Sequence, residues 1–226
     1  MGTTVDIETT DGHKLTGYRA EPNGKPRGGL VVIQEIFGVN SHIRAVTDGF
    51  AAEGYVALAP GMFDRVGQNI QLGYSPEDVA KGREIRAKID YDDAVRDMGA
   101  AVAALSGCAG YAVGVVGYCW GGSLAWSAAT RLDGVDAAVG YYGGFVPDMA
   151  DETPRHPVML HFGDADESIP LAGVEKVKAA HPDVPVYIYP AGHGFNCDQR
   201  GSYDAESAKL ARERTLEFFA EHLAKA

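Results

Sequence analysis

Short apolar runs alternate with longer stretches of helical periodicity along most of the chain, and this alternation limits the fold more than any other feature. The apolar runs cover residues 30–34, 55–60, 112–116, 135–141, 158–162 and 184–189. The helical stretches cover residues 41–53, 76–87, 91–105, 120–131, 171–180 and 203–223. Strands that are apolar on both faces and separated by helices are typical of a parallel sheet that is covered on both sides.

The remaining segments complete the predicted architecture. Residues 3–20 form two short strand patterns around Asp11-Gly12, which indicates a β-hairpin. Residues 62–76 have no clear periodicity, and we expect a surface excursion there. No linker-like composition or internal repeat divides the chain. We therefore predict one α/β domain over residues 1–226, with a mostly parallel sheet, helices on both faces and an N-terminal hairpin.

Composition and charge exclude several classes of partner. A formal net charge of -11 at pH 7 argues against a nucleic-acid or membrane-surface binder. Neither a signal peptide nor an apolar run of about 18 residues is present, so we expect a cytoplasmic protein. In that compartment Cys108, Cys119 and Cys197 are expected to be reduced thiols. The sequence has no C-x-x-C or H-E-x-x-H spacing, and we predict neither a metal nor another cofactor.

The stretch Gly117-Tyr118-Cys119-Trp120-Gly121 has the G-x-nucleophile-x-G spacing of a turn between a strand and a helix, with cysteine at the centre. Such a turn leaves little room for side chains two positions before and after its central residue, and glycine meets that demand. The start of the following helix directs unpaired amides toward the thiol, which favours the thiolate. A buried cysteine in a glycine-rich turn is the alternative.

A base and an acid follow this cysteine in the order that a hydrolase requires. His193 comes just after the apolar run 184–189, in a loop with glycine on either side. Asp164 and Asp166 both follow the run 158–162, and spacing alone does not decide between them. Nucleophile, acid and base in this chain order, each at the end of a strand, favour a catalytic triad over three unrelated loop residues.

The assembled residues resemble the dienelactone hydrolase family (carboxymethylenebutenolidases), which has the α/β-hydrolase fold. The resemblance covers nearly the whole chain. Its most specific pieces are QEIFGVN at 34–40, GYCWGG at 117–122, YYG at 141–143, the G-x-x-D of 163–166 and the GHGF around His193. The resemblance implies a hydrolase of small esters or lactones, it selects Asp166 as the acid, and it suggests a monomer.

The resemblance also gives a role to Glu35, a carboxylate at the end of a buried strand. It implies that Glu35 helps to deprotonate the thiol when substrate arrives, whereas the residues alone allow a salt bridge with Arg44 or Arg83. The backbone amides of Ile36 and Trp120 would then stabilise the oxyanion of the attacked carbonyl.

A dienelactone carries a carboxylate, so cationic side chains are expected around its binding site. Arg200 is the preferred candidate because it follows His193 by seven residues. Arg83 and Arg86 are weaker candidates because they lie on a helical stretch, where arginine is often solvated. Tyr142 is expected to help shape the pocket.

Two rival functions remain open at this stage. One keeps the triad but takes a small neutral ester as its substrate. The other is a non-catalytic protein that senses redox state through Cys119, with Cys197 as a second thiol four residues beyond His193.

Overall fold

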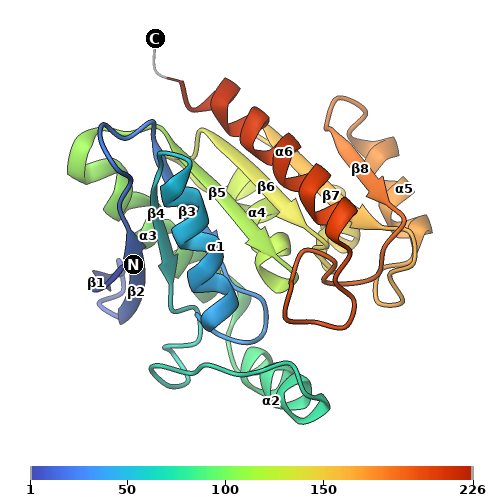
Figure 1. The fold of residues 1–226 in the computed structure, drawn as a ribbon, viewed down its shortest axis with the longest axis horizontal. Helices are drawn as coiled ribbons and strands as arrows, with labels where there is room; N and C mark the ends of the chain where they lie inside the picture. Colours follow the sequence, from blue (N-terminus) through green and yellow to red (C-terminus); the bar gives the residue numbers. More distant parts are fainter. Residues whose placement is uncertain (1, 225–226) are drawn as a thin grey trace.

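The eight strands form one twisted sheet in the order β1-β2-β4-β3-β5-β6-β7-β8 (Figure 1). The computed structural model describes residues 2–224, without the side chains of residues 108 and 109. The strands are β1 Thr3–Glu8, β2 Lys14–Ala20, β3 Gly29–Ile33, β4 Val56–Pro60, β5 Val113–Tyr118, β6 Ala137–Tyr141, β7 Val158–Gly163 and β8 Val186–Tyr189. β1 and β2 form the antiparallel hairpin, and β3 to β8 run parallel.

Helices cover both faces of this sheet. They are α1 Ser41–Ala52, α2 Pro76–Ala87, α3 Tyr91–Ala109, α4 Trp120–Arg131, α5 Leu171–Ala180 and α6 Ala205–His222, with a short 3-10 helix η1 at Val146–Met149. α1 and α6 lie in front of the sheet in Figure 1, and α3 and α4 lie behind it. Every residue of β3 to β7 is buried, which explains their lack of polar alternation. The predicted α/β fold is confirmed.

α2 stands apart from both faces, beyond the carboxyl ends of the strands (Figure 1). Its start is fixed by a capping box, in which the Ser75 hydroxyl accepts from the Asp78 amide and the Asp78 carboxylate accepts from the Ser75 amide. Pro76 occupies the first turn, where its missing N–H costs nothing. The helix is therefore well defined by local sequence although little of it is buried.

Most of the segment 62–76 lies at the surface, as its lack of periodicity suggests, but its first two residues do not. Met62 and Phe63 are buried, and the Phe63 ring stacks on Trp120 with centroids 5.8 Å apart. Hydrogen-bonded loop residues have no repeating pattern of exposure, so a periodicity search cannot detect their burial.

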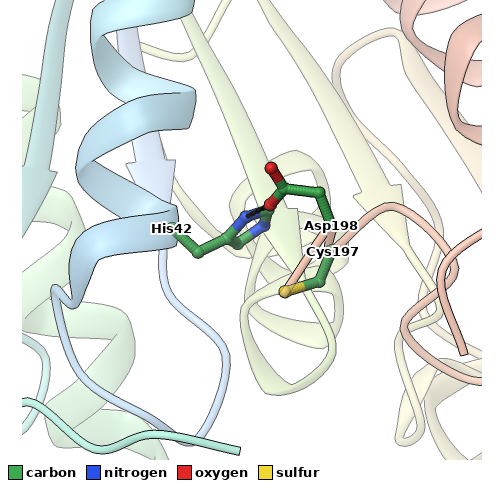
Figure 2. A group of neighbouring side chains, drawn as sticks. All are labelled: His42, Cys197 and Asp198. Atoms are coloured by element: carbon green, nitrogen blue, oxygen red, sulfur yellow. Dashed lines mark hydrogen bonds and ion pairs between the residues drawn. The ribbon is translucent and has the colours of Figure 1, made fainter. Parts of the chain in front are cut away.

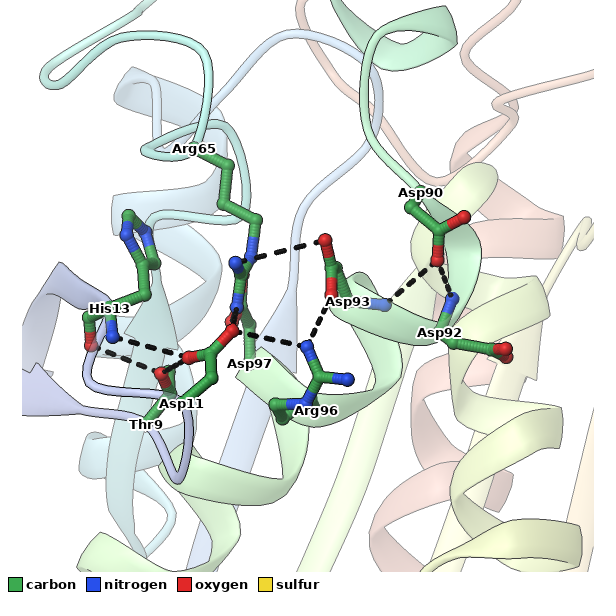
Figure 3. Close-up of polar contacts among 9 residues, drawn as sticks. All are labelled: Thr9, Asp11, His13, Arg65, Asp90, Asp92, Asp93, Arg96 and Asp97. Atoms are coloured by element: carbon green, nitrogen blue, oxygen red, sulfur yellow. Dashed lines mark hydrogen bonds and ion pairs between the residues drawn. The ribbon is translucent and has the colours of Figure 1, made fainter.

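A network of arginines and aspartates fastens this segment and the hairpin to α3 (Figure 3). Arg65 donates to Asp97 at 2.7 Å and to Asp11 at 2.9 Å, and Arg96 donates to Asp11 at 3.1 Å. Asp97 is 1% exposed, so its charge depends on Arg65 for compensation. The network holds the edge of the sheet rather than forming a pocket.

Some element boundaries differ from the predicted ones by a few residues. α3 continues to Ala109, and β8 begins at Val186 rather than at residue 184. α6 begins at Ala205 because the Asp204 carboxylate caps it, accepting from the Ser207 amide at 2.8 Å. No helix within residues 2–224 is long and apolar enough to cross a bilayer.

Candidate active site

Cys119 occupies the turn between β5 and α4 in a strained conformation, with φ 56° and ψ -115°. Its amide donates to the Tyr141 carbonyl of the neighbouring strand at 3.0 Å, which holds the turn against the sheet. A Cβ on Gly117 would lie 1.8 Å from the Gly121 carbonyl oxygen, and a Cβ on Gly121 would lie 2.5 Å from the Ile33 carbonyl oxygen. Backbone approaches this close require the two glycines, as the spacing predicted.

Cys119, His193 and Asp166 form a continuous hydrogen-bonded set. His193 Nε2 lies 3.2 Å from Cys119 Sγ, and His193 Nδ1 lies 2.7 Å from Asp166 Oδ2. The other Asp166 oxygen accepts from the amides of Ser168 at 2.8 Å and Ile169 at 3.1 Å, so the buried carboxylate has a fixed orientation. The structure thus brings together the three residues that the sequence placed at separate strand ends.

The competing acid, Asp164, is exposed, and its amide donates to the Tyr189 carbonyl at 2.8 Å. It therefore belongs to the turn after β7. The geometry of His193 selects Asp166, in agreement with the G-x-x-D motif.

The surroundings of His193 favour its protonated form. Burial, the largest single effect, lowers its pKa, but the hydrogen bonds to Asp166 and Cys119 and the charges of these two groups together raise that pKa to about 10. The imidazole is therefore a strong proton acceptor while the sulfur and the carboxylate both face it.

The sulfur opens into a pocket of about 410 Å³ between the carboxyl ends of the strands and α2. Its apolar lining includes Ile36, Phe37, Val79, Trp120 and Phe145. Three arginines, Arg83, Arg86 and Arg200, also line it. Among the described residues, no carboxylate lies within ion-pair distance of Arg83 or Arg86, so the pocket is strongly cationic in an acidic protein.

Arg86 is held partly inside this pocket rather than on a solvated helix face. Its guanidinium lies 4.3 Å from the centre of the Phe145 ring, and burial lowers its pKa. Its Nε has no hydrogen-bond partner within residues 2–224. The expectation that an arginine on this helical stretch is solvated fails for Arg86, because α2 turns one face toward the sulfur.

Glu35 pairs with Arg200 and not with the arginines expected from the sequence. Its Oε1 lies 3.0 Å from Arg200 Nη1, whereas Arg44 donates to the Val39 carbonyl and Arg83 lies in the pocket wall without a carboxylate partner. Glu35 is 1% exposed and its Oε2 has no hydrogen-bond partner in the described chain. The salt bridge that the residues alone allowed is present, but its partner comes from a loop that sequence spacing does not bring near.

The two predicted oxyanion donors both border the pocket. Trp120 is the first residue of α4, so its amide has no carbonyl within the helix to bond. Ile36 follows β3 and borders the pocket together with Cys119. Its carbonyl oxygen packs against Gly82 of α2, where a Cβ would lie only 2.1 Å from that oxygen. Their roles in catalysis stay predictions.

Tyr142 was expected to help shape the pocket, but it is not among the residues that line it. It is fully buried, and its ring meets His193 edge-on with centroids 5.2 Å apart. Its φ of 39° reflects a sharp turn after β6, where its amide donates to the His161 carbonyl at 2.7 Å. Tyr142 therefore supports the imidazole from behind.

The pocket residues that the sequence did not reveal are mostly apolar. Phe37, Val79 and Phe145 come from three separate segments, and no local motif marks them as neighbours. Phe37 lies inside the QEIFGVN stretch, so that family motif was the one feature of the sequence that could have indicated a pocket-lining role for it.

A nucleophile elbow on a mostly parallel sheet, followed along the chain by an acid and a base, defines an α/β-hydrolase. A sequence profile of the dienelactone hydrolase family matches residues 15–223. The chain is 36% identical to a Synechocystis sp. protein provisionally named carboxymethylenebutenolidase, with 96% of this chain and 98% of that one aligned. It is 33% identical to the carboxymethylenebutenolidase of Pseudomonas putida, over 96% of this chain and 95% of that protein.

A solved structure, provisionally titled a dienelactone hydrolase from Klebsiella pneumoniae, superposes with a TM-score of 0.84 at 29% identity. The superposition covers 98% of this chain and 99% of that one. The chain therefore belongs to the dienelactone hydrolase family, and it is an enzyme of the ester and lactone hydrolase class.

Proposed function

We propose that this protein is a cysteine-dependent hydrolase that opens a lactone or ester of a small carboxylated substrate through an acyl-enzyme on Cys119. The observation that carries the proposal is the hydrogen-bonded set of Cys119, His193 and Asp166 at the floor of a pocket with three arginines. The name of the Pseudomonas putida relative, carboxymethylenebutenolidase, supports a lactone that bears a carboxylate.

Acylation begins when the Cys119 thiol gives its proton to His193 Nε2, 3.2 Å away. The sulfur attacks the substrate carbonyl carbon, and the carbonyl electrons move to the oxygen, which the amides of Ile36 and Trp120 stabilise. One such donor contributes roughly 3 kcal/mol of transition-state stabilisation. The bond from carbon to the leaving oxygen then breaks, and His193 protonates that oxygen. In a lactone the new hydroxyl or enol stays attached to the acyl group.

Deacylation uses the same imidazole as a base. With the sulfur in a thioester, His193 loses the interaction that helped to hold its proton, and it accepts a proton from water. The resulting hydroxide attacks the thioester carbon, and the sulfur leaves as thiolate. The product acid ionises, and the thiolate and imidazolium regenerate the starting pair. Asp166 keeps the Nδ1 proton of His193 in place throughout.

Arg200 links substrate charge to Glu35. In the structure its guanidinium serves the Glu35 carboxylate, which is buried and has one oxygen without a partner. A substrate carboxylate in the pocket would compete for the same guanidinium, helped by Arg83 and Arg86. Glu35, deprived of its counter-ion inside the protein, would then gain from taking up a proton. We assign Glu35 to that step as an alternative acceptor: with the charged substrate bound it takes the proton of Cys119 in place of His193, the already protonated His193 supplies the proton of the leaving oxygen, and Glu35 returns its proton to the sulfur when the product acid is released.

The function is tested by hydrolysis of a carboxylated dienelactone, a neutral lactone and an activated aryl ester. Cys119→Ala and His193→Ala should abolish turnover of all three, whereas Cys197→Ala should retain it. If the wild-type protein is no more active than Cys119→Ala on every substrate, the proposed cysteine mechanism is refuted. The alternative of a protein that senses redox state through Cys119 would then be favoured. Preference for the two neutral substrates would instead favour the neutral-ester alternative.

Glu35→Gln separates the role of this carboxylate from that of the triad. With the carboxylated substrate, acylation followed by stopped flow should slow by about tenfold or more, because the alternative acceptor is gone. With the aryl ester it should be unchanged, because no substrate charge reaches Arg200. Equal rates for wild type and variant on both substrates would make Glu35 a structural partner of Arg200 only.

A further inference from the structure

Three side chains capable of binding a metal ion meet where α1 lies against the loop after β8 (Figure 2). They are His42 in the first turn of α1 and Cys197 and Asp198 in the loop. One atom from each, an imidazole nitrogen, the thiol sulfur and a carboxylate oxygen, all lie within 4.8 Å of one another. None of the three has a part in the mechanism above.

The separations within this cluster are close to those around a bound zinc ion. Bonds of about 2.0–2.3 Å at tetrahedral angles place neighbouring ligand atoms roughly 3.3–3.7 Å apart. His42 Nδ1 and Asp198 Oδ1 are already 3.1 Å apart. An adjustment of about 1 Å therefore brings the sulfur to the same centre.

Histidine 42 supplies the observation that distinguishes this cluster from an ordinary surface ion pair. The residue is 4% exposed, one ring nitrogen faces Asp198, and the other, Nε2, is buried with no hydrogen-bond partner in the described chain. Nδ1 is the nitrogen that faces Asp198, so it is the ring atom that would coordinate the ion, and Nε2 would carry the ring proton.

An entry route is also present. A groove of about 360 Å³ lies between α1 and α6, and His42 and Asp198 both line it. Asp198 is 67% exposed, so it can deliver an ion from solvent to the buried pair. The open side of the groove leaves room for water as a fourth ligand.

We propose that His42, Cys197 and Asp198 form a binding site for a thiophilic divalent cation of the Zn²⁺ class. A thiolate and an imidazole select against Mg²⁺ and Ca²⁺, which prefer oxygen ligands. The prediction of no metal rested on the absence of short metal-binding spacings. It could not detect this cluster, because His42 and Cys197 are 155 residues apart in the sequence. A bound ion would fasten the loop that carries both His193 and Arg200 to α1. The proposal does not depend on the hydrolase mechanism.

Co²⁺ is the probe of choice because a cobalt–thiolate bond gives a near-ultraviolet charge-transfer band and tetrahedral cobalt gives visible bands. The parent protein for the titration carries Cys108→Ser and Cys119→Ala, so Cys197 is its only thiol. We expect one Co²⁺ per chain with both sets of bands, displaced by Zn²⁺. Cys197→Ser should abolish the charge-transfer band, and His42→Gln and Asp198→Asn should each weaken binding at least tenfold.

The matched control is Asp183→Asn, which removes an exposed carboxylate elsewhere and should leave the titration unchanged. Zn²⁺ should raise the thermal unfolding midpoint of the parent but not that of Cys197→Ser, which shows that the loss is one of binding and not of folding. Absence of the charge-transfer band at millimolar Co²⁺, or its persistence in Cys197→Ser, would overturn the proposal.

Discussion

The ion pair between Glu35 and Arg200 gives the sharpest test of the site, because one partner is almost entirely buried. Glu35 is 1% exposed and Arg200 is 20% exposed, with 3.0 Å between Oε1 and Nη1. Arg200→Met removes the counter-ion and leaves a carboxylate in the interior, for which we expect a loss of about 3–5 kcal/mol in the free energy of unfolding. For a domain of this length that corresponds to a midpoint lower by roughly 6–20 °C.

Urea unfolding at pH 8 measures this loss in a double-mutant cycle with Glu35→Gln. The variant with both changes should recover at least about 2 kcal/mol relative to Arg200→Met, since no charge is then left buried. The control is Arg155→Met, which breaks an exposed pair with Asp133 and should cost about 1 kcal/mol or less.

The reasoning fails if the coupling free energy between the two positions is below about 0.5 kcal/mol, since the pair would then be no stronger than a surface one. Activity provides the second readout. Arg200→Met should lower kcat/KM for a carboxylated lactone by about tenfold or more relative to an activated neutral ester. An equal loss on both substrates would mean that Arg200 only supports the fold.

Three further predictions follow from the local geometry. Asp166→Asn should reduce kcat by about a thousandfold or more and lower the pKa of His193, measured by NMR of its ring protons, whereas an unchanged pKa would contradict the assigned hydrogen bond. Burial lowers the pKa of His161 to about 3, so between pH 6.5 and pH 3 the unfolded chain binds a proton at this residue that the folded chain does not. The free energy of unfolding should therefore decline as the pH falls through this range. His161→Gln should flatten that part of the profile measured by urea unfolding. Gly117→Ala should cost several kcal/mol or prevent folding, because its Cβ would lie 1.8 Å from a backbone oxygen, while Gly107→Ala in open space on α3 should be neutral or stabilising.

The elements that the sequence predicted well are those with a strong local signal. The strands β3 to β7 are buried on both faces, so each appears as an apolar run whatever its neighbours are. The segment 62–76 lies mostly at the surface as predicted, but the burial of Met62 and Phe63 was missed, because it comes from contacts with other parts of the chain, such as Trp120, and not from any repeat of their own. Strand order and the burial of loop residues are set by tertiary packing. They leave no periodic pattern of apolar residues in a single sequence.

The same distinction applies to the site. Cys119, Asp166 and His193 each follow a strand of a parallel sheet, and chain topology alone brings such positions to one edge. The partner of Glu35 depends instead on the path of an irregular loop, so spacing pointed to the wrong arginines. Tyr142 was misplaced for a related reason, since a turn with positive φ directs its ring behind His193.

The loop after β8 joins these observations, because it places His193, Cys197 and Arg200 within eight residues. Several hydrogen bonds fix its path, among them the Ser202 hydroxyl donating to the His193 carbonyl at 2.7 Å and the Arg200 amide donating to the Cys197 carbonyl at 3.1 Å. Gly194 has a φ of 79°, and a Cβ there would lie 2.5 Å from the Arg200 guanidinium. The glycine after His193 is therefore needed for Arg200 to lie across the loop and reach Glu35. The proposed catalytic base, the proposed substrate-binding cation and the proposed metal ligand are thus parts of one folded segment, and a change that moves one of them is expected to move all three.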